Sequence, residues 1–162
     1  MNFADTNWLE AMFVHVDEEK QRRVIAERFH RQNPGMIGVS QIVLLEARNV
    51  FSRITGSSNP PEWQELQAGF SGRFYLDPMN WDLLRREVYR IFENYSPHAA
   101  IGTFDAAVLA SARLAGATRI LSFDENLKAL AMAEGLRVYP ELGKSGRGSL
   151  ARLKAKTPRR IT

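Results

Sequence analysis

Residues 101–140 read IGTFDAAVLASARLAGATRILSFDENLKALAMAEGLRVYP, and this stretch decides the fold. It begins with an alanine-rich helical pattern that Thr103 is expected to cap, and a short apolar strand follows. The stretch predicts a helix, a strand, a second helix and a last strand, over residues 103–116, 120–122, 125–134 and 137–139. Alternating helices and strands are typical of α/β domains with a mostly parallel sheet.

The sequence before this stretch shows the same alternation. Ser40 is a natural N-cap for a helix that Gly56 ends, and Asn33-Pro34-Gly35 ends the helix before it. The predicted strands cover residues 1–4, 36–39 and 74–76, and the predicted helices cover about 8–13, 17–32, 41–55, 61–70 and 80–95. The whole chain therefore fits one α/β domain.

The chain has 162 residues, the length of a single domain, and its net charge of +4 is unevenly distributed. Residues 143–162 hold seven of the 22 basic residues and none of the 18 acidic ones. We therefore expect a globular domain over residues 1–142 and a basic, flexible tail over residues 143–162. A basic arm favours a polyanionic partner such as a nucleic acid. For the tail alone, a purely solubilising role is an equally good interpretation.

Composition disfavours several classes of protein. No apolar run reaches the roughly 18 residues that a membrane-spanning helix needs, and the start of the chain does not follow the pattern of a secretory signal. The chain has no cysteine, which excludes disulfides, thiolate metal ligands and a cysteine nucleophile. These features predict a cytoplasmic protein without a membrane partner.

Acidic side chains follow two of the predicted strands. Asp5 follows the first strand, and Asp124 comes directly after the strand at residues 120–122. The carboxyl ends of parallel strands line one edge of a sheet, where ligands bind, so both acids should face that edge. Asp is also a common N-cap, and for either acid taken singly a helix cap is the simpler interpretation.

Two further acids lie within predicted helices. Asp105 falls in the first turn of its helix, where the helix dipole alone would favour an acid. Glu46 lies roughly 9 Å along its helix, which is too deep for a cap. Because its neighbours Ile42 and Leu45 favour burial, we expect Glu46 to lie away from the fully solvated face.

If these four acids converge, their charges need a partner. Two carboxylates ~4 Å apart repel by about 4 kcal/mol at an effective dielectric constant near 20. A hard divalent cation such as Mg²⁺ or Mn²⁺ neutralises carboxylates and suits phosphoryl chemistry. His15, His30 and His98 share no ligand spacing, so we interpret them as structural residues.

The order and spacing of these residues resemble the PIN-domain nucleases, and most closely the VapC-like toxins of bacterial and archaeal toxin–antitoxin modules. The motifs are ADTNWLEA at residues 4–11, SQIVLLEARNVF at residues 40–51, and the whole of residues 101–140. The resemblance covers about residues 1–140, and residues 56–76 match nothing specific. It implies a PIN-like three-layer α/β/α sandwich with a mostly parallel central sheet.

By this resemblance, four acids hold Mg²⁺ or Mn²⁺ and carry the catalysis: Asp5, Glu46, Asp105 and Asp124. Neighbouring polar side chains would orient these carboxylates through hydrogen bonds. The candidates are Thr6, Asn7, Ser40, Thr103, Ser122 and Asn126. Ser122 stands where the family often has Thr, and Asn126 stands where some members carry a further acid.

The resemblance also implies a function. The family cleaves RNA with metal-activated water, and VapC-like members are toxins that a small antitoxin protein neutralises and that tend to form homodimers. Five arginines are weaker candidates for contacts with RNA phosphates, and solvated helix surface is the simpler interpretation of each: Arg48, Arg53, Arg113, Arg147 and Arg152.

Two other functions fit parts of the sequence. A non-catalytic PIN-like module would bind RNA through the basic tail, although the presence of all four acids argues against it. A haloacid-dehalogenase-like phosphatase would need a second aspartate two residues after Asp5, and that position holds Asn7. The nuclease is therefore the leading hypothesis.

Overall fold

The computed structural model of this protein describes residues 1–155, and five short strands form one parallel sheet at its centre. The strands are β1 (Asn2–Ala4), β2 (Ile37–Val39), β3 (Phe74–Leu76), β4 (Arg119–Leu121) and β5 (Arg137–Tyr139). Their order in the sheet is β3-β2-β1-β4-β5, and every neighbouring pair is parallel. The predicted α/β fold is confirmed.

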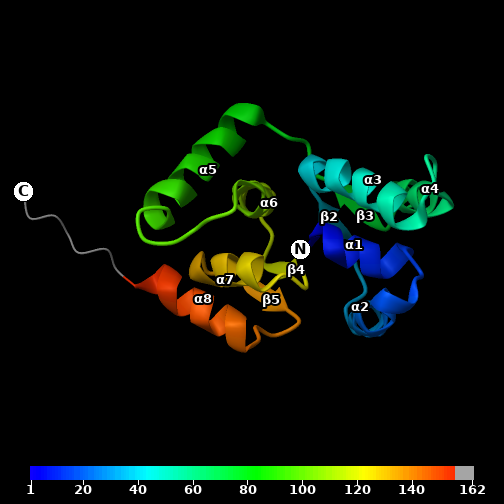
Figure 1. Cartoon of the computed structure of the whole chain (residues 1–162). Helices are drawn as coiled ribbons and strands as arrows, with labels where there is room; N and C mark the ends of the chain where they lie inside the picture. Colours follow the sequence, from blue (N-terminus) through cyan, green and yellow to red (C-terminus); the bar gives the residue numbers. More distant parts are fainter. Residues whose placement is uncertain (156–162) are drawn as a thin grey trace, which may run out of the picture.

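Helices cover both faces of this sheet. The α-helices are α1 (Thr6–Phe13), α2 (Lys20–Gln32), α3 (Gln41–Thr55), α4 (Pro61–Ala68), α5 (Trp81–Tyr95), α6 (Thr103–Leu114), α7 (Glu125–Ala133) and α8 (Lys144–Lys154). Short 3₁₀ turns precede α2 and follow α4, at η1 (Asp17–Glu19) and η2 (Gly69–Ser71). Figure 1 shows α1–α4 on one side of the strands and α5–α8 on the other. The three layers of an α/β/α sandwich are therefore present.

The central strand β1 is packed tightly against its neighbour β2. Phe3 is fully buried and pairs with Gly38 of β2 and Ile120 of β4. A Cβ atom added at Gly38 would lie 2.5 Å from the Phe3 ring, so this position needs a glycine. The close packing fixes the register of the strands, and with it the edge at which Asp5 emerges.

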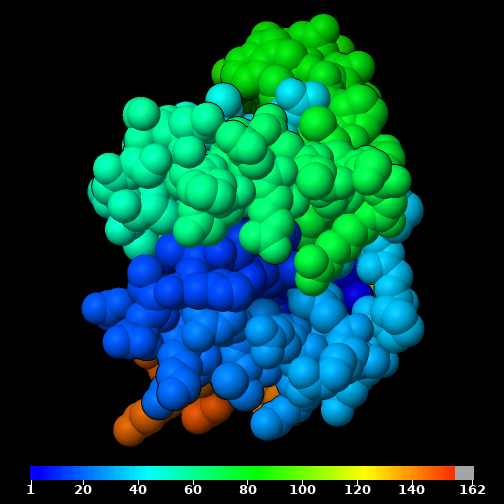
Figure 2. Space-filling view, turned by 90° about the vertical axis from the view of Figure 1, so that its right-hand side faces the viewer, coloured from blue at the N-terminus to red at the C-terminus, as the bar shows by residue number. Residues whose placement is uncertain are grey.

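The first half of the chain forms one face of the molecule. Figure 2 shows this face in space-filling form, with α1 and α2 below, α4 across the middle, and α5 protruding at the top. The C-terminal part appears only at the lower edge of this view. Helix α8 therefore belongs to the other side of the molecule.

The prediction of a flexible tail from residue 143 is wrong for residues 144–154, because they form helix α8. Helix α8 packs against α7, and the segment before it is also fastened to α7. The Gly143 N–H donates to Glu125 Oε2 over 3.0 Å, the buried Lys128 amine donates to the carbonyl oxygens of Pro140 and Glu141, and Leu153 is buried. The rest of the predicted tail, residues 156–162, lies outside the described residues.

None of the helices within residues 1–155 combines the length and hydrophobicity that crossing a membrane requires.

Candidate active site

The four predicted acids line one pocket of about 460 Å³. Asp5 lies at the end of β1, Asp124 lies between β4 and α7, Asp105 is in the first turn of α6, and Glu46 is in α3. The pocket is therefore assembled from four separate segments of the chain. It opens at the carboxyl edge of the sheet, where the ligand sites of open parallel sheets are found.

Asp5 is the most buried of these acids, with 7% of its surface exposed. Its side chain caps α1 by accepting a hydrogen bond from the Thr6 N–H over 2.8 Å. Its second carboxylate oxygen accepts from the Ser122 hydroxyl over 3.0 Å. Both oxygens are thus held in place, so the side chain has a fixed orientation in the pocket.

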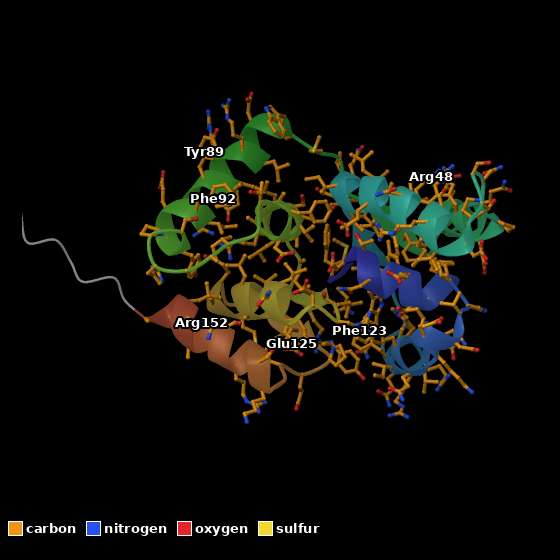
Figure 3. All side chains as sticks on the ribbon, viewed as in Figure 1. Arg48, Tyr89, Phe92, Phe123, Glu125 and Arg152 are labelled. Atoms are coloured by element: carbon orange, nitrogen blue, oxygen red, sulfur yellow. The ribbon has the colours of Figure 1, made fainter. Side chains whose placement is uncertain are left out.

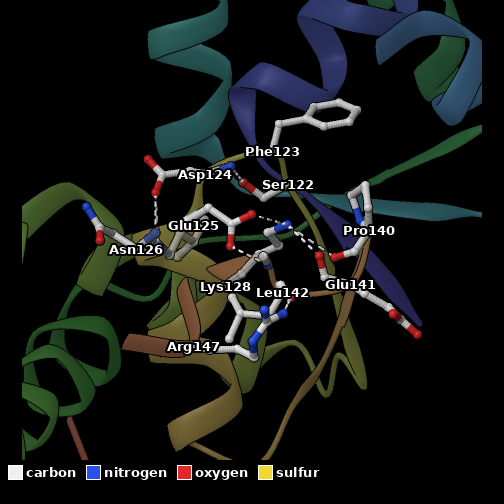
Figure 4. Close-up of polar contacts among 12 residues, drawn as sticks. Ser122, Phe123, Asp124, Glu125, Asn126, Lys128, Pro140, Glu141, Leu142 and Arg147 are labelled. Atoms are coloured by element: carbon white, nitrogen blue, oxygen red, sulfur yellow. Dashed lines mark hydrogen bonds and ion pairs between the residues drawn. The ribbon is translucent and has the colours of Figure 1, made fainter. Parts of the chain in front are cut away.

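Ser122 joins the first and the last acid of the pocket. Its fully buried hydroxyl donates to Asp5 and accepts from the Asp124 N–H over 3.0 Å. Asn7 supports the same turn because its Oδ1 accepts from the Phe123 N–H over 3.0 Å. Figure 4 shows Ser122 and Asp124 side by side at this turn. Ser122 and Asn7 thus hold the turn that carries Asp124 against the end of β1.

Asp124 is both a helix cap and a pocket residue. Its Oδ1 accepts from the N–H groups of Asn126 and Leu127 over 2.8 and 3.1 Å, which caps α7. The Asn126 side chain points elsewhere, because its Oδ1 accepts from the Ser149 hydroxyl of α8. Asn126 therefore supports Asp124 through its backbone.

Two local expectations need correction, and one is confirmed. Thr103 does not cap α6: Gly102 occupies the N-cap position, no side chain caps this helix end, and Thr103 is the first helical residue. Leu45 is 75% exposed, so its burial does not explain why Glu46 turns towards the pocket. Ser40 caps α3 as predicted, by accepting from the Val43 N–H over 3.0 Å, and it is not among the residues that line the pocket.

The acids repel one another within this pocket. Burial raises the pKa of Asp5 to about 7; the Thr6 and Ser122 hydrogen bonds oppose this increase, and the charges of Asp105 and Glu46 add to it. Burial, followed by the charges of Asp124 and Glu46, raises the pKa of Asp105 to about 6. The pocket therefore favours protons or a cation over four free carboxylates.

The donor groups of the pocket fit a hard cation. All four acids offer carboxylate oxygens, the ligands that Mg²⁺ and Mn²⁺ prefer. The Thr6 hydroxyl, in the same pocket, is buried and has no hydrogen-bond partner among the described residues. However, no three Asp, Glu, His or Cys side chains within residues 1–155 are already arranged to hold an ion. Ion binding would thus require the side chains to move closer together.

Glu10 of α1 also lines the pocket, although no motif of the sequence marks it. Burial raises its pKa to about 7, and the neighbouring Glu19 carboxyl adds to this effect, while Arg22 and Arg53 lower it. Glu10 lies four residues after Thr6, one helical turn further along the same face. This spacing is the signal from which the sequence could have placed Glu10 in the pocket.

The five predicted arginines lie in different places. Arg53 lines the acidic pocket. Arg48 instead lies over the Trp63 ring and donates to Ser52 and to the Ser58 carbonyl, so it faces α4. Figure 3 shows Arg48 and Arg152 on opposite sides of the molecule.

The remaining two arginines have structural partners. Arg113 forms ion pairs with Glu87 of α5 and Glu134 after α7, at 2.8 and 3.5 Å, which fastens α6 to its neighbours. Arg147 donates to the Leu142 carbonyl. Arg113 is therefore a structural residue rather than a phosphate ligand.

The histidines also serve the structure. His30 Nε2 accepts from the Trp8 indole N–H over 3.0 Å, and burial lowers the pKa of His30 to about 4. The His98 ring donates to the Leu153 carbonyl over 2.9 Å, and His15 lies at the exposed end of α1 near the Met12 carbonyl. None of the three lines the acidic pocket.

The sequence of residues 3–132 matches the family model of the PIN domain. The chain belongs to the PIN domain family. PIN domains are generally nucleases, and all four pocket acids lie within the matched region. No curated protein matches the chain in sequence.

Several solved structures have a similar fold. The structure of VapC20 from Mycobacterium tuberculosis, a toxin that cleaves the sarcin–ricin loop, has a TM-score of 0.65 and 20% identity, over 84% of this chain and 96% of that one. FitAcB from Neisseria gonorrhoeae has a TM-score of 0.58 and 15% identity, over 86% and 96%. VapBC2 from Rickettsia felis, bound to a DNA fragment from the promoter, has a TM-score of 0.55 and 18% identity, over 85% and 96%.

Proposed function

We propose that this protein is a Mg²⁺- or Mn²⁺-dependent endoribonuclease. The observation that carries the proposal is the convergence of Asp5, Glu46, Asp105 and Asp124 on one pocket, where burial and then the neighbouring acids raise the pKa of Asp5 and Asp105. A pocket of this kind selects a divalent cation. The similarity of the fold to VapC20, a toxin that cleaves the sarcin–ricin loop, supports RNA as the substrate.

In this proposal the four carboxylates hold the cation, and the rest of the pocket keeps them in position. A bound divalent ion would neutralise the carboxylates and activate water for attack on a phosphodiester. Ser122 and the Thr6 N–H fix the Asp5 oxygens, and the N-terminus of α7 fixes Asp124. The hydroxyl of Thr6 is free to hydrogen-bond a ligand in the pocket, since it has no partner within the described chain.

The test is incubation of the protein with total RNA and Mn²⁺ or Mg²⁺, followed by mapping of the RNA ends. We expect cleavage that leaves 5′-phosphate and 3′-hydroxyl ends and that EDTA abolishes. Asp5→Asn should reduce the rate by more than about a hundredfold, which exceeds the usual effect of removing a partner of a metal ligand. Cleavage that persists in EDTA would refute the proposal, and binding without cleavage under any divalent ion would favour a non-catalytic RNA-binding module.

We also propose that the nuclease is a toxin with a small protein antitoxin. Similarity in fold to FitAcB and to VapBC2, which was crystallised on promoter DNA, supports such a partner. The neighbouring gene should then encode a short DNA-binding protein, and adding that protein should inhibit cleavage. A homodimer and a cytoplasmic location, where the RNA substrate is found, complete the proposal; light scattering of the purified protein tests the dimer.

A further inference from the structure

A second pocket, of about 620 Å³, adjoins the acidic pocket, and Asp105 lines both. We call it the flanking pocket. Its apolar part consists of Ile101, before α6, Leu130 of α7 and Leu153 of α8. Its volume lies within the range of about 300–1,000 Å³ that is typical of small-ligand sites.

Polar side chains form a continuous hydrogen-bonded wall from this pocket to the acids. The Arg152 guanidinium donates to Ser149 Oγ over 3.1 Å, and the Ser149 hydroxyl donates to Asn126 Oδ1 over 3.3 Å. The Asn126 N–H in turn donates to the Asp124 carboxylate over 2.8 Å. The wall therefore carries a cation at one end and a pocket acid at the other.

Helix α8 makes this second pocket, although it lies beyond the matched PIN region of residues 3–132. It contributes Ser149, Arg152 and Leu153 to the lining. The His98 ring ties the α5–α6 connection to it by donating to the Leu153 carbonyl over 2.9 Å. Figure 3 shows Arg152 on α8, on the opposite side of the molecule from α3 and α4. Helix α8 thus forms one wall of the flanking pocket.

We propose that the flanking pocket binds the nucleotide next to the cleaved phosphodiester in a single-stranded RNA. The proposal rests on the proposed nuclease function. A base has flat apolar faces, which suit the Ile101–Leu130–Leu153 surface, and polar edges, which suit Asn126 and Ser149. A phosphate of the same strand suits the Arg152 guanidinium. The shared residue Asp105 makes the two pockets adjacent, as consecutive positions of one strand require.

Steady-state cleavage of a single-stranded oligoribonucleotide that carries a mapped cleavage site tests the proposal. We expect Arg152→Ala to raise KM by about tenfold with kcat changed less than about twofold, because a charge-assisted contact is lost from substrate binding. The slope of log KM against log salt concentration should fall by about 0.7, the value for one phosphate contact on a single strand. Lys144→Ala, which removes the same charge at the other end of α8, should change neither quantity.

A second variant tests the base rather than the phosphate. Ser149→Phe fills the flanking pocket without removing a charge, and it should raise KM for the intact oligonucleotide. Removing one base beside the cleavage site should weaken wild-type cleavage by about tenfold but should have little further effect on Ser149→Phe. Circular dichroism melting of each variant confirms that it is folded.

The outcomes separate this inference from the nuclease proposal. If the wild type cleaves RNA but both variants keep its KM and salt slope, the flanking pocket does not bind RNA and the inference alone is wrong. If the wild type neither cleaves nor binds RNA, both proposals fail. If it binds a mixed-sequence oligoribonucleotide without cleaving it, loss of that binding in Arg152→Ala supports the inference and its retention overturns it.

Discussion

Replacing Asp5 by Asn should stabilise the metal-free protein, although it destroys the proposed site. The substitution removes a charge from a side chain with only 7% of its surface exposed and keeps its shape. The Asn carbonyl can still accept from the Thr6 N–H, and its amide can donate to the Ser122 hydroxyl, which can act as an acceptor. The main effect is therefore the loss of a buried negative charge.

The magnitude follows from the pKa of Asp5, which rises from 3.8 to about 7 on folding. The folded protein holds this proton more tightly than the unfolded chain. The contribution of Asp5 to the free energy of unfolding therefore falls as the pH rises from about 4 to about 7, and it is constant above that. At about 1.4 kcal/mol per pKa unit, the penalty is on the order of 4 kcal/mol at pH 8 and about 2 kcal/mol at pH 5. Asp5→Asn should remove most of it.

Urea unfolding in EDTA at pH 5 and pH 8 measures this effect. We expect Asp5→Asn to exceed the wild type in free energy of unfolding, and the difference to be about 2 kcal/mol larger at pH 8. Asp82→Asn is a matched control on the exposed start of α5 and should change stability by less than about 0.5 kcal/mol. Mg²⁺ at 100 times its Kd should then stabilise the wild type by about 2.7 kcal/mol and leave Asp5→Asn unchanged.

The reasoning fails if Asp5→Asn is no more stable than the wild type at pH 8, or if the difference between the two proteins does not depend on pH. The first result would mean that repulsion and burial do not penalise the Asp5 carboxylate. The second would mean that the stabilisation comes from packing rather than from charge.

Three further predictions concern the pocket and its support. Ser122→Ala should lower kcat/KM for RNA cleavage by about 10–100-fold, because it releases both Asp5 and the turn at Asp124; unchanged kinetics would contradict this role. Cleavage should increase with pH through about 6 to 7, as Asp105 and Asp5 lose their protons, and kcat/KM profiles should shift to lower pH when the Mg²⁺ concentration is raised. Glu134→Gln should cost about 2 kcal/mol in urea unfolding, since it breaks two partly buried ion pairs, without changing the cleavage rate per folded molecule.

The parallel sheet and its acidic carboxyl edge were predictable because the sequence pattern that indicates them is local. Short apolar runs such as residues 120–122 are flanked by polar residues that begin helices, and parallel strands place their carboxyl ends at the same edge. The pattern alone therefore predicts that Asp5 and Asp124 lie together. The residues alone place Asp105 in a first helical turn and turn Glu46 away from the solvated face, but their place in the pocket came with the resemblance, since neither spacing nor composition fixes how a helix rotates about its axis.

Helix α8 could not be predicted from its own sequence. The run KSGRGSLARLK contains two glycines, which weaken helices by about 1 kcal/mol each. Tertiary contacts replace the missing propensity: Glu125 accepts from the Gly143 N–H, and a Cβ atom at Gly146 would come within 2.4 Å of Leu142 Cδ1. Gly146, which argues against a helix in the sequence, is thus what allows α8 to pack closely.

A helix cap and a pocket residue are alternative interpretations of Asp5 and Asp124 in the sequence, and the structure shows that they are compatible. Each carboxylate accepts hydrogen bonds from backbone N–H groups at the first turn of a helix, and it lines the acidic pocket at the same time. Asp105 also lies in a first helical turn, so three of the four acids lie at helix N-termini.

The positive end of a helix dipole favours an acid by about 0.3–1 kcal/mol, up to about 2 kcal/mol in partly buried sites. This is less than the penalty of about 4 kcal/mol at Asp5, where the pKa rises to about 7 despite its cap. The helix ends therefore offset part of the penalty that burial and repulsion impose, and the proposed cation would offset the rest. Glu46, in the middle of α3, has no helix end beside it, so in the proposed metal site its carboxylate would depend most on the ion for its place in the pocket.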